Sequence, residues 1–579
     1  MRPLVNGIRS GSTTLDGAMA RRRFDPSAPI FALFALLLAI LVFLPMGWLA
    51  VFSVRGPDGA ATLTYFAQLV TDDEMVRPLI VTLIVATSVS TLCTLVATPM
   101  AWLIARTDMP FARPIRLLVM ASFVTPPFLG AVAWEILAAP NSGLINQVYR
   151  LAFGLGRSDR LIDIYTVYGL ILAIANYTFP YVFILVANGL DRIPSDLEDA
   201  SSILGASRWR TAARITVPLV LPAIVAGTLI AFLQAMNNFG SPAIIALPAG
   251  FHTMTTKIWS MFQYPPQPGM AAAAAVPLLA VTIMLLHLQR AALGRRSYAV
   301  VGGKGAQARI IRLGWLRWAA LAYCGAVVSA AVIFPYIALI LTAFAKTLTI
   351  TWAPEGFGLG NFEFVFFEFS STKPALWNTM LLGVMAATAG TAVTLIIAYV
   401  TSRQAVPGHR VLGFLATAPI AIPGIVFGVG LFFAYTHPPL VLYGTLTIMF
   451  IAFLTTELPI GYQQFQAAFR GIHIELEEAS RILGATRLRS LRDIVAPLIT
   501  TAVVSTWCFI FIAAIRELSA AVLLYTANTK VLSVVIYDLN ENGELGAIAV
   551  LGLLMLAVTF AVVAVAYRLP RATSIPTSA

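Results

Sequence analysis

The sequence predicts an all-α polytopic membrane protein with about twelve transmembrane helices, arranged as two parallel six-helix repeats. Composition sets the environment, because 59% of the 579 residues are apolar and only 11% are charged, whereas about a quarter of a soluble domain is charged. The length allows about a dozen spans of roughly 20 apolar residues with their connecting loops. A polar loop that occurs twice with the same spacing divides these spans into two halves.

Apolar runs long enough to cross a bilayer occur twelve times along the chain. We expect spans at 30–52, 78–105, 115–139, 167–190, 217–245, 270–289, 319–344, 376–402, 412–435, 443–468, 497–525 and 546–567. The fifth and eleventh are the least regular because polar residues interrupt both runs. Six spans in each half place both copies of the loop on the same side of the membrane, which indicates a parallel repeat about an axis along the membrane normal.

The repeat gives the following expected organisation of the chain. We expect a cytoplasmic N-terminal segment at 1–29, a first six-span unit at 30–290 with its loop at 191–216, a basic cytoplasmic linker at 291–318, a second six-span unit at 319–568 with its loop at 470–496, and a cytoplasmic tail at 569–579.

The formal net charge of +12 raises the question of a nucleic-acid partner, and the placement of the basic residues answers it. If the N-terminus is cytoplasmic, most of the 38 Lys and Arg residues fall in segments on the inner side. The positive-inside rule describes this bias for a protein with both ends in the cytoplasm. Membrane lipid is therefore the expected neighbour of these residues, and no nucleic-acid partner is predicted.

The repeated loop keeps its register without a gap. The first copy contains Asp199, Ala200, Ser201, Gly205, Ile215 and Pro218, and the second contains Glu478, Ala479, Ser480, Gly484, Ile494 and Pro497. Each residue of the second copy lies 279 positions after its counterpart. Upstream, Arg106 matches Arg403 at an offset of 297, so the first half carries about 18 extra residues, which we expect in the outer loop 140–166.

Both copies predict the same local structure. Residues 197–204 and 476–483 are expected to form short helices with acidic residues in the first turn. Gly205 and Gly484 can take a positive φ and end each helix. A basic amphipathic stretch follows each glycine and can lie along the lipid headgroups before the next span begins.

This loop resembles the EAA loop of ATP-binding-cassette importer permeases of type I, in which it forms the coupling helix that inserts into the nucleotide-binding subunit. The resemblance places the ATPase-coupling residues at Glu198, Asp199, Ala200 and Gly205, and at Glu477, Glu478, Ala479 and Gly484. The first copy departs from the pattern with Asp for the leading Glu, and both copies have Ser for the second Ala. The resemblance implies a bacterial inner-membrane location, two copies of a cytoplasmic ATPase subunit and a periplasmic substrate-binding protein.

No enzyme site is expected within the chain. The segment Gly302-Gly303-Lys304-Gly305 lacks the spacing and the hydroxyl of a phosphate-binding loop, so ATP would be bound by the partner subunit and this chain would carry no cofactor. The five histidines and three cysteines show no metal-ligand spacing. We therefore expect neither catalytic nor metal-binding residues.

Polar residues inside apolar spans are the candidates for a substrate pathway, since a charge at the centre of a membrane helix costs roughly 2.5–3.5 kcal/mol on insertion scales. The candidates are Asn237, Asn238, Glu457, Arg516 and Glu517. Glu517 matches Asn238 at the offset of 279, so the polar positions coincide between halves while the charges occur in only one. The alternative is that Arg516 and Glu517 pair with other helices for structural reasons, and Glu135 is a weaker candidate near the outer end of its span.

Two complete units in one chain, with Arg-Glu-Leu-Ser-Ala-Ala-Val-Leu-Leu at 516–524 and Phe-Gly-Ser-Pro at 239–242 in the matching place, are similar to the fused permeases of ferric-iron importers. Related permeases for thiamine, aminoethylphosphonate or polyamines share this architecture. The resemblance implies ferric iron as the cargo, although no residue selects it. A different class, an ion-gradient-driven secondary carrier with Glu457 or Glu517 as its proton site, also has twelve spans in two repeats but has no use for the repeated loops.

Overall fold

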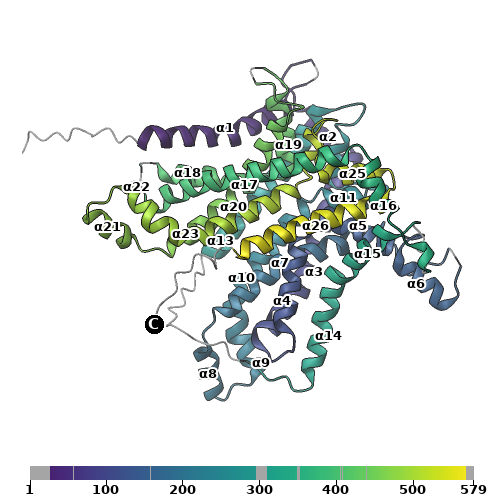
Figure 1. Ribbon diagram of the computed structural model, residues 1–579, viewed down its shortest axis with the longest axis horizontal. Helices are drawn as coiled ribbons and strands as arrows, with labels where there is room; N and C mark the ends of the chain where they lie inside the picture. Colours follow the sequence, from purple (N-terminus) through teal and green to yellow (C-terminus); the bar gives the residue numbers. More distant parts are fainter. Residues whose placement is uncertain are drawn as a thin grey trace, which may run out of the picture.

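The computed structural model describes residues 27–568 except 57, 157, 295–309, 348–352, 405, 407 and 439. Most of the expected N-terminal segment, most of the linker with Gly302 to Gly305, and the tail at 569–579 lie outside these residues. The regular secondary structure of the described part is helical, apart from three isolated β-bridges. Ten helices are long and apolar enough to cross a membrane, or up to twelve if two bent helix pairs each count as one span. The expected all-α architecture is confirmed (Figure 1).

The first half contains the following helices in chain order: α1 (Ser27–Ser53), α2 (Thr64–Thr71), α3 (Asp73–Arg106), α4 (Ala112–Val124), α5 (Pro127–Ala138), α6 (Leu144–Phe153), α7 (Val167–Asp191), α8 (Ser195–Ile203), α9 (Arg208–Thr211), η1 (Ala212–Thr216), α10 (Val217–Met236), α11 (Gly240–Ile245), α12 (Met254–Ser260) and α13 (Pro268–Gly294).

The second half repeats this order with α14 (Leu316–Val328), η2 (Ser329–Ile333), α15 (Phe334–Phe344), η3 (Pro354–Gly356), α16 (Gly360–Glu363), η4 (Phe364–Glu368), α17 (Thr372–Ser402), α18 (His409–Thr417), η5 (Ala418–Ala421), α19 (Gly424–Tyr435), α20 (Leu446–Arg470), α21 (Ile474–Ile482), α22 (Arg487–Ser490), η6 (Leu491–Val495), α23 (Ala496–Ile515), α24 (Ala521–Leu524), α25 (Leu532–Glu541) and α26 (Leu545–Arg568). The bounds of α5 and α19 differ by 297 at both ends, and those of α10 and α23 by 279.

The third span of each half, expected at 115–139 and 412–435, is broken in the structure. The chain bends by 104° between α4 and α5 and by 109° between η5 and α19. Pro126-Pro127 and Pro423 lie at these breaks, and proline removes a backbone N–H and clashes with the preceding helical turn. The spans expected at 217–245 and 497–525 were also drawn too long, since α10 ends at Met236 and α23 at Ile515.

The first span of each half packs on the other half: this span is α1 in the first half, and it runs from α14 to α15 in the second half. Helix α1 contacts α18 and α19 of the second half, as well as α13, and in Figure 1 it runs along α18. Helix α15 in turn contacts α5 of the first half and α26. The two bundles are therefore each closed by a helix from the other repeat.

The spans have two distinct ends, which we call the loop end and the far end. Helices α7 and α20 lead into the repeated loops at the loop end, and at 1.5 Å per residue a 25-residue helix places its other terminus about 37 Å away, at the far end. The segment 139–166 between α5 and α7 is longer than its counterpart 436–445, and it holds the extra residues of the first half as expected.

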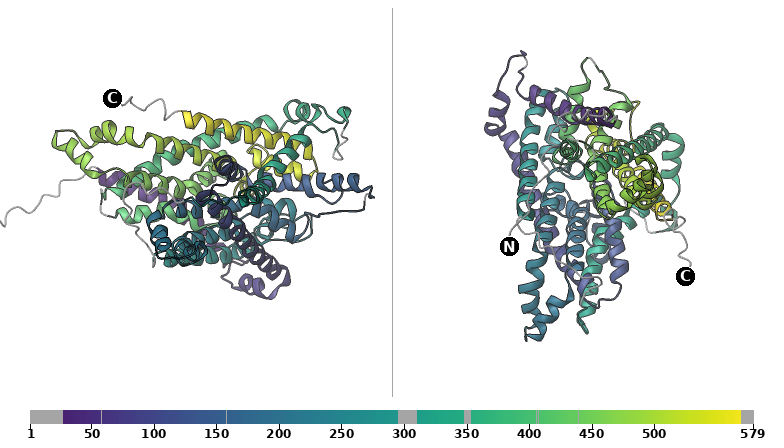
Figure 2. Two further views of the ribbon diagram at one scale, coloured as in Figure 1. Left: turned by 90° about the horizontal axis from the view of Figure 1, so that it is seen from below. Right: turned by 90° about the vertical axis from the view of Figure 1, so that its left-hand side faces the viewer.

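The two halves meet at the far end and diverge toward the loop end. In Figure 1, α8 and α21 lie at separate corners of the molecule, whereas α5, α11, α25 and α26 converge. Figure 2 shows the blue-teal helices of the first half and the green-yellow helices of the second as two bundles set at an angle.

Candidate functional site

The repeated loops fold in the same way. Helices α8 and α21 begin and end at positions 279 apart, and each is followed by a glycine in the left-handed region, Gly205 with φ +79° and Gly484 with φ +91°. The N–H groups of Ala206 and Ala485 close the last turn on the carbonyls of Ser201 and Ser480, both at 3.1 Å. This closure is typical of a glycine-terminated helix, so the predicted stop signal acts in both copies.

The tip of each loop presents two large apolar side chains to the outside. Ile203 and Leu204 are 85% and 87% exposed, and Ile482 and Leu483 are 86% and 88% exposed. These pairs occupy equivalent positions of the repeat. Leaving two such side chains in contact with water is unfavourable by roughly 1.5–3 kcal/mol each relative to burial, so matched pairs at the tips of two loops indicate surfaces that a partner covers.

The base of each loop is held by a buried ion pair. Nη1 of Arg106 lies 3.6 Å from Oε2 of Glu198, and Nε of Arg403 lies 2.8 Å from Oε1 of Glu477. Arg106 also donates to the carbonyls of Leu190 and Ile193 at the end of α7. The arginine at the end of the second span thus ties together the loop helix and the fourth span.

Each glutamate also accepts a hydrogen bond from a hydroxyl group, and this hydroxyl comes from a different place in the two halves. Thr216 donates to Oε1 of Glu198 at 2.8 Å, but the residue equivalent to Thr216 is Val495. Tyr399, at the end of α17, donates instead to Oε2 of Glu477 at 3.2 Å. The two halves therefore satisfy the same buried carboxylate with different neighbours.

The structure separates the predicted coupling residues into two groups. Glu198 and Glu477 are buried at the base of the loop, with exposed fractions of 6% and 8%. The remaining residues are exposed on the loop surface: Asp199, Ala200, Gly205, Glu478, Ala479 and Gly484. No role of Arg106 and Arg403 in the loops was predicted from the sequence, although their match at an offset of 297 is a signal that could have indicated one.

Asn238 and Glu517 play the same structural part in the two halves. Oδ1 of Asn238 accepts from the N–H of Ser241 at 3.0 Å and so begins α11, and Oε1 of Glu517 accepts from the N–H of Ala520 at 2.9 Å before α24. Side-chain acceptors at this position satisfy N–H groups that have no partner inside the helix. Both residues lie between helices, not in mid-span as drawn from the sequence.

Arg516 connects the two halves. Its Nη1 donates to the carbonyl oxygen of Phe123 at 3.0 Å, and the guanidinium lies 5.7 Å from the centre of the Phe123 ring. In a continuous helix this carbonyl would accept from the residue four positions later, which is Pro127 and has no N–H. Arg516 therefore satisfies a carbonyl that the α4–α5 break leaves free.

Glu457 lies in the middle of α20 and is buried, with an exposed fraction of 8%. Among the residues that the structure describes, its Oε2 has no hydrogen-bond partner. The charges of Arg516 and Glu517 both act on it, so the structure groups these three residues. Asn237 directly follows α10, and its buried Oδ1 has no hydrogen-bond partner in the described part of the chain. Within the described residues, no hydrogen bond or ion pair joins Asn237 or Asn238 to Glu457, so the shared passage expected from the sequence stays a prediction.

Among the described residues, no group of three or more His, Cys, Asp or Glu side chains could hold a metal ion. At the predicted site residues, charged groups come together in the two loop pairs and around Glu457.

Comparison with known families places two segments of the chain in one family. Residues 94–297 and 390–575 each match the model described as binding-protein-dependent transport system inner membrane component. The two matches fall one in each half, and each includes a repeated loop.

Individual relatives resemble the chain over most of its length. The ferric transport system permease protein FbpB of Actinobacillus pleuropneumoniae is 28% identical over 449 residues, which cover 76% of this chain and 63% of the relative. The putative ferric transport system permease protein FbpB 1 of Haemophilus influenzae is 28% identical over 417 residues, 70% of this chain and 64% of the relative. The chain thus matches less than two thirds of the length of either protein.

More distant similarities cover one half. The molybdenum transport system permease protein ModB of Escherichia coli is 27% identical over 191 residues, 32% of this chain and 79% of the relative. A chain in the crystal structure of a bacterial ABC transporter involved in the import of the acidic polysaccharide alginate aligns with a TM-score of 0.37 and 20% identity, covering 45% of this chain and 96% of that one.

Proposed function

Because this chain belongs to the family of binding-protein-dependent transport system inner membrane components, we propose that it is a transmembrane permease subunit of an ATP-driven importer. Its two halves would form the translocation pathway, and the loop end would face the cytoplasm with both chain termini. A periplasmic binding protein would deliver the cargo to the far end. ATP would be hydrolysed by two copies of a separate ATPase subunit, so this chain itself would have no enzymatic activity and no cofactor.

The matched apolar tips of the two loops are the observation that carries this proposal. A pair of ATPase subunits needs two docking elements on one face, and Ile203-Leu204 and Ile482-Leu483 provide them at equivalent positions. The buried pairs Arg106–Glu198 and Arg403–Glu477 would then transmit movement of the docked loop to the second span of each half. An ion-gradient-driven carrier with a proton site at Glu457 is the competing proposal, supported by the unpartnered carboxylate oxygen in mid-span.

Ferric iron is the cargo we propose, on the basis of the two relatives named as ferric transport permeases. The selectivity would reside in the binding protein, so thiamine, aminoethylphosphonate and polyamines are the alternatives for the same mechanism.

The docking proposal is tested with the double variant Leu204→Asp with Leu483→Asp. Co-purification of the ATPase and uptake of labelled ferric iron are measured. We expect at least a tenfold loss of both, because two charged side chains would have to be buried in the partner. The matched control replaces the exposed loop residues Glu475 and Arg481 with Ala, which leaves the apolar tips and the predicted coupling residues intact. Uptake by the purified chain alone, driven by a pH gradient in liposomes, would instead support the carrier.

A further inference from the structure

The far end of the molecule holds a closed junction between the two halves, and the repeat makes its two sides directly comparable. The hydroxyl of Thr82 accepts from the N–H of Met254 at 2.7 Å, and that of Thr379 accepts from the N–H of Leu532 at 2.8 Å. Met254 and Leu532 are therefore equivalent, at an offset of 278. From this register, Trp259 corresponds to Tyr537.

These two equivalent aromatic residues contact each other across the junction. The ring centres of Trp259 and Tyr537 are 5.7 Å apart with an interplanar angle of 84°. Phe239 packs against both rings, at 6.2 Å and 6.1 Å. Since a residue can contact its own repeat equivalent only close to the axis that relates the halves, this aromatic cluster marks the centre of the junction.

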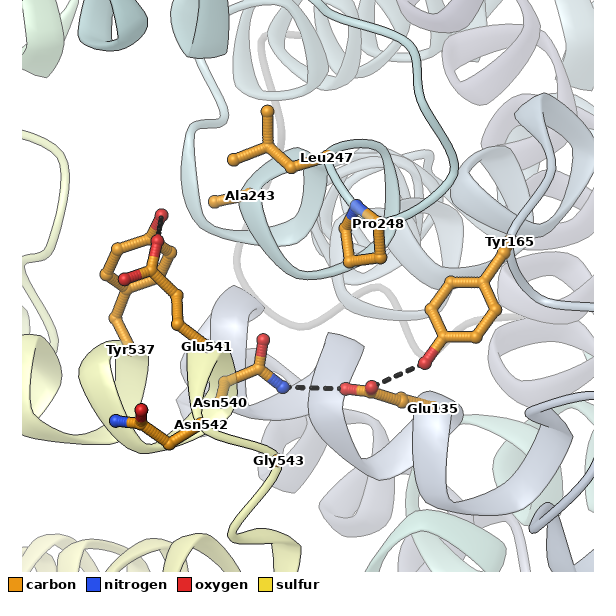
Figure 3. Close-up of a pocket in the computed structure, with 10 residues that line it drawn as sticks. All are labelled: Glu135, Tyr165, Ala243, Leu247, Pro248, Tyr537, Asn540, Glu541, Asn542 and Gly543. Atoms are coloured by element: carbon orange, nitrogen blue, oxygen red, sulfur yellow. Dashed lines mark hydrogen bonds between the residues drawn. The ribbon is translucent and has the colours of Figure 1, made fainter. Parts of the chain in front are cut away.

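One flank of the junction is polar. Asn540 of α25 donates from Nδ2 to Oε2 of Glu135 at the end of α5, at 2.8 Å, and Tyr165 donates to Oε1 at 2.6 Å. Figure 3 shows both hydrogen bonds converging on the carboxylate. A pocket of about 410 Å³ lies beside them, with Glu135, Tyr165 and Asn540 in its lining.

The other flank is aromatic. The residue equivalent to Glu135 at the offset of 297 is Phe432, and the residue equivalent to Asn540 at the offset of 278 is Phe262. These two rings contact each other at 5.2 Å with an interplanar angle of 84°. The ring of Tyr443 also contacts Phe432, with ring centres 5.2 Å apart. The same contact between the halves is thus made once by hydrogen bonds and once by packed rings.

The two flanks respond differently to separation. Water from the adjoining pocket can take over the hydrogen bonds of Glu135 and Asn540 when they part, so the net loss is small. No such replacement exists for Phe262 and Phe432, because separating packed rings exposes apolar surface and gives up their contact. We propose that the far end opens on one side only, with Glu135–Asn540 as the latch and Phe262–Phe432 as the hinge. This inference rests on the proposed role of the chain as an ATP-driven transport path.

Paired cysteines test the asymmetry in the full chain with its native partners. Three double variants are compared: Glu135→Cys with Asn540→Cys, Phe262→Cys with Phe432→Cys, and the control Glu74→Cys with Lys257→Cys. The control replaces an ion pair of 3.2 Å at the far end within the first half, which should not move. Cross-linking yield is measured at rest and after trapping the ATPase with ATP and vanadate. The parent chain, which contains three buried cysteines of its own, gives the background yield.

We expect all three pairs to cross-link at rest, and the latch pair alone to lose at least fivefold in yield in the trapped state. Loss at both the latch and the hinge would show symmetric opening and overturn the proposal, as would unchanged yield at the latch or no cross-link there at rest. Absence of any co-purifying, vanadate-sensitive ATPase would instead be the failure of the proposed function.

A second measurement depends on neither ATPase nor cargo. Ala243 is buried and lines the pocket beside the latch, so a cysteine placed there by Ala243→Cys reports access from the far end. We expect Asn540→Ala to speed its labelling by a membrane-impermeant maleimide at least threefold, and Phe262→Ala to change it by less. Equal acceleration by both, or by neither, would contradict the assignment of latch and hinge.

Discussion

Arg403, the residue that follows α17, donates from Nε to Oε1 of Glu477 in α21 at 2.8 Å, and both side chains are at least nine-tenths buried. The pair joins the repeated loop to the end of a span that reaches the far end of the molecule. Loop and span should therefore move as one body.

Replacing Arg403 with Ala should loosen the second loop, because it leaves the Glu477 carboxylate buried without its counter-charge. Breaking a buried pair from one side typically costs about 3–5 kcal/mol. We expect faster proteolysis within 470–496 and at least a tenfold fall in uptake. The exposed Arg410→Ala is the matched control. The double variant Arg403→Ala with Glu477→Ala should be less damaged than the single one, and an equally damaged double variant would show that the pair is not what fixes the loop.

The different second partners of the two glutamates allow an exchange experiment. Tyr399→Phe removes the hydrogen bond to Glu477 and should destabilise the loop by about 1 kcal/mol. Adding Val495→Thr introduces the hydroxyl that the first half uses at the equivalent position, so it should recover most of the loss. Thermal unfolding of the purified chain measures both effects. The prediction is wrong if Val495→Thr helps equally when Tyr399 is present.

Glu517→Asn tests whether this carboxylate lies in the substrate pathway or only accepts the hydrogen bond that begins α24. Asn is the residue that the first half uses for the same hydrogen bond, so we expect stability close to that of the parent and at least half of its uptake. Glu517→Leu removes the acceptor and should cost about 0.5–2 kcal/mol. A tenfold loss of uptake in a stable Glu517→Asn variant would place the carboxylate in the pathway.

Arg516 and Glu457 should behave as a coupled pair. Arg516→Gln alone removes the positive charge that acts on Glu457 and weakens the bond to the Phe123 carbonyl, whereas adding Glu457→Gln also removes the carboxyl group on which that charge acts. We expect the double variant to be more stable than Arg516→Gln, with a coupling of about 0.5–3 kcal/mol. Additive effects in a double-mutant cycle of thermal unfolding would show that the two residues act independently.

The repeat was the part of the fold that could be predicted well, because an offset of 279 or 297 is visible without any knowledge of packing. It located α8 and α21 and the glycines that end them. The breaks after Met236 and Ile515 were missed as helix ends, since apolar residues continue on both sides and hydropathy does not register a change of direction. The prolines at 126–127 and 423 are visible in the sequence as residues that can bend a membrane helix, but the size of each bend depends on packing.

The candidate site was predictable where residues are close in sequence and not where they meet by folding. Gly205 ends its helix by local geometry, so its role was readable. Arg106 and Glu198 are far apart in sequence, and only the packing of α3 against α7 brings them together. The same holds for Arg516 and Phe123, whose contact depends on how the two halves meet.

The exchange of first helices has a consequence for assembly. Neither repeat can complete its own wall, since α1 closes the second bundle and α15 closes the first. A half made alone would lack the helix from the other repeat that packs on it, so the helices that this partner helix covers would face lipid. Joining both repeats in one polypeptide supplies each half with its missing helix in a fixed one-to-one ratio. The linker therefore fixes the ratio of the two halves as well as connecting them.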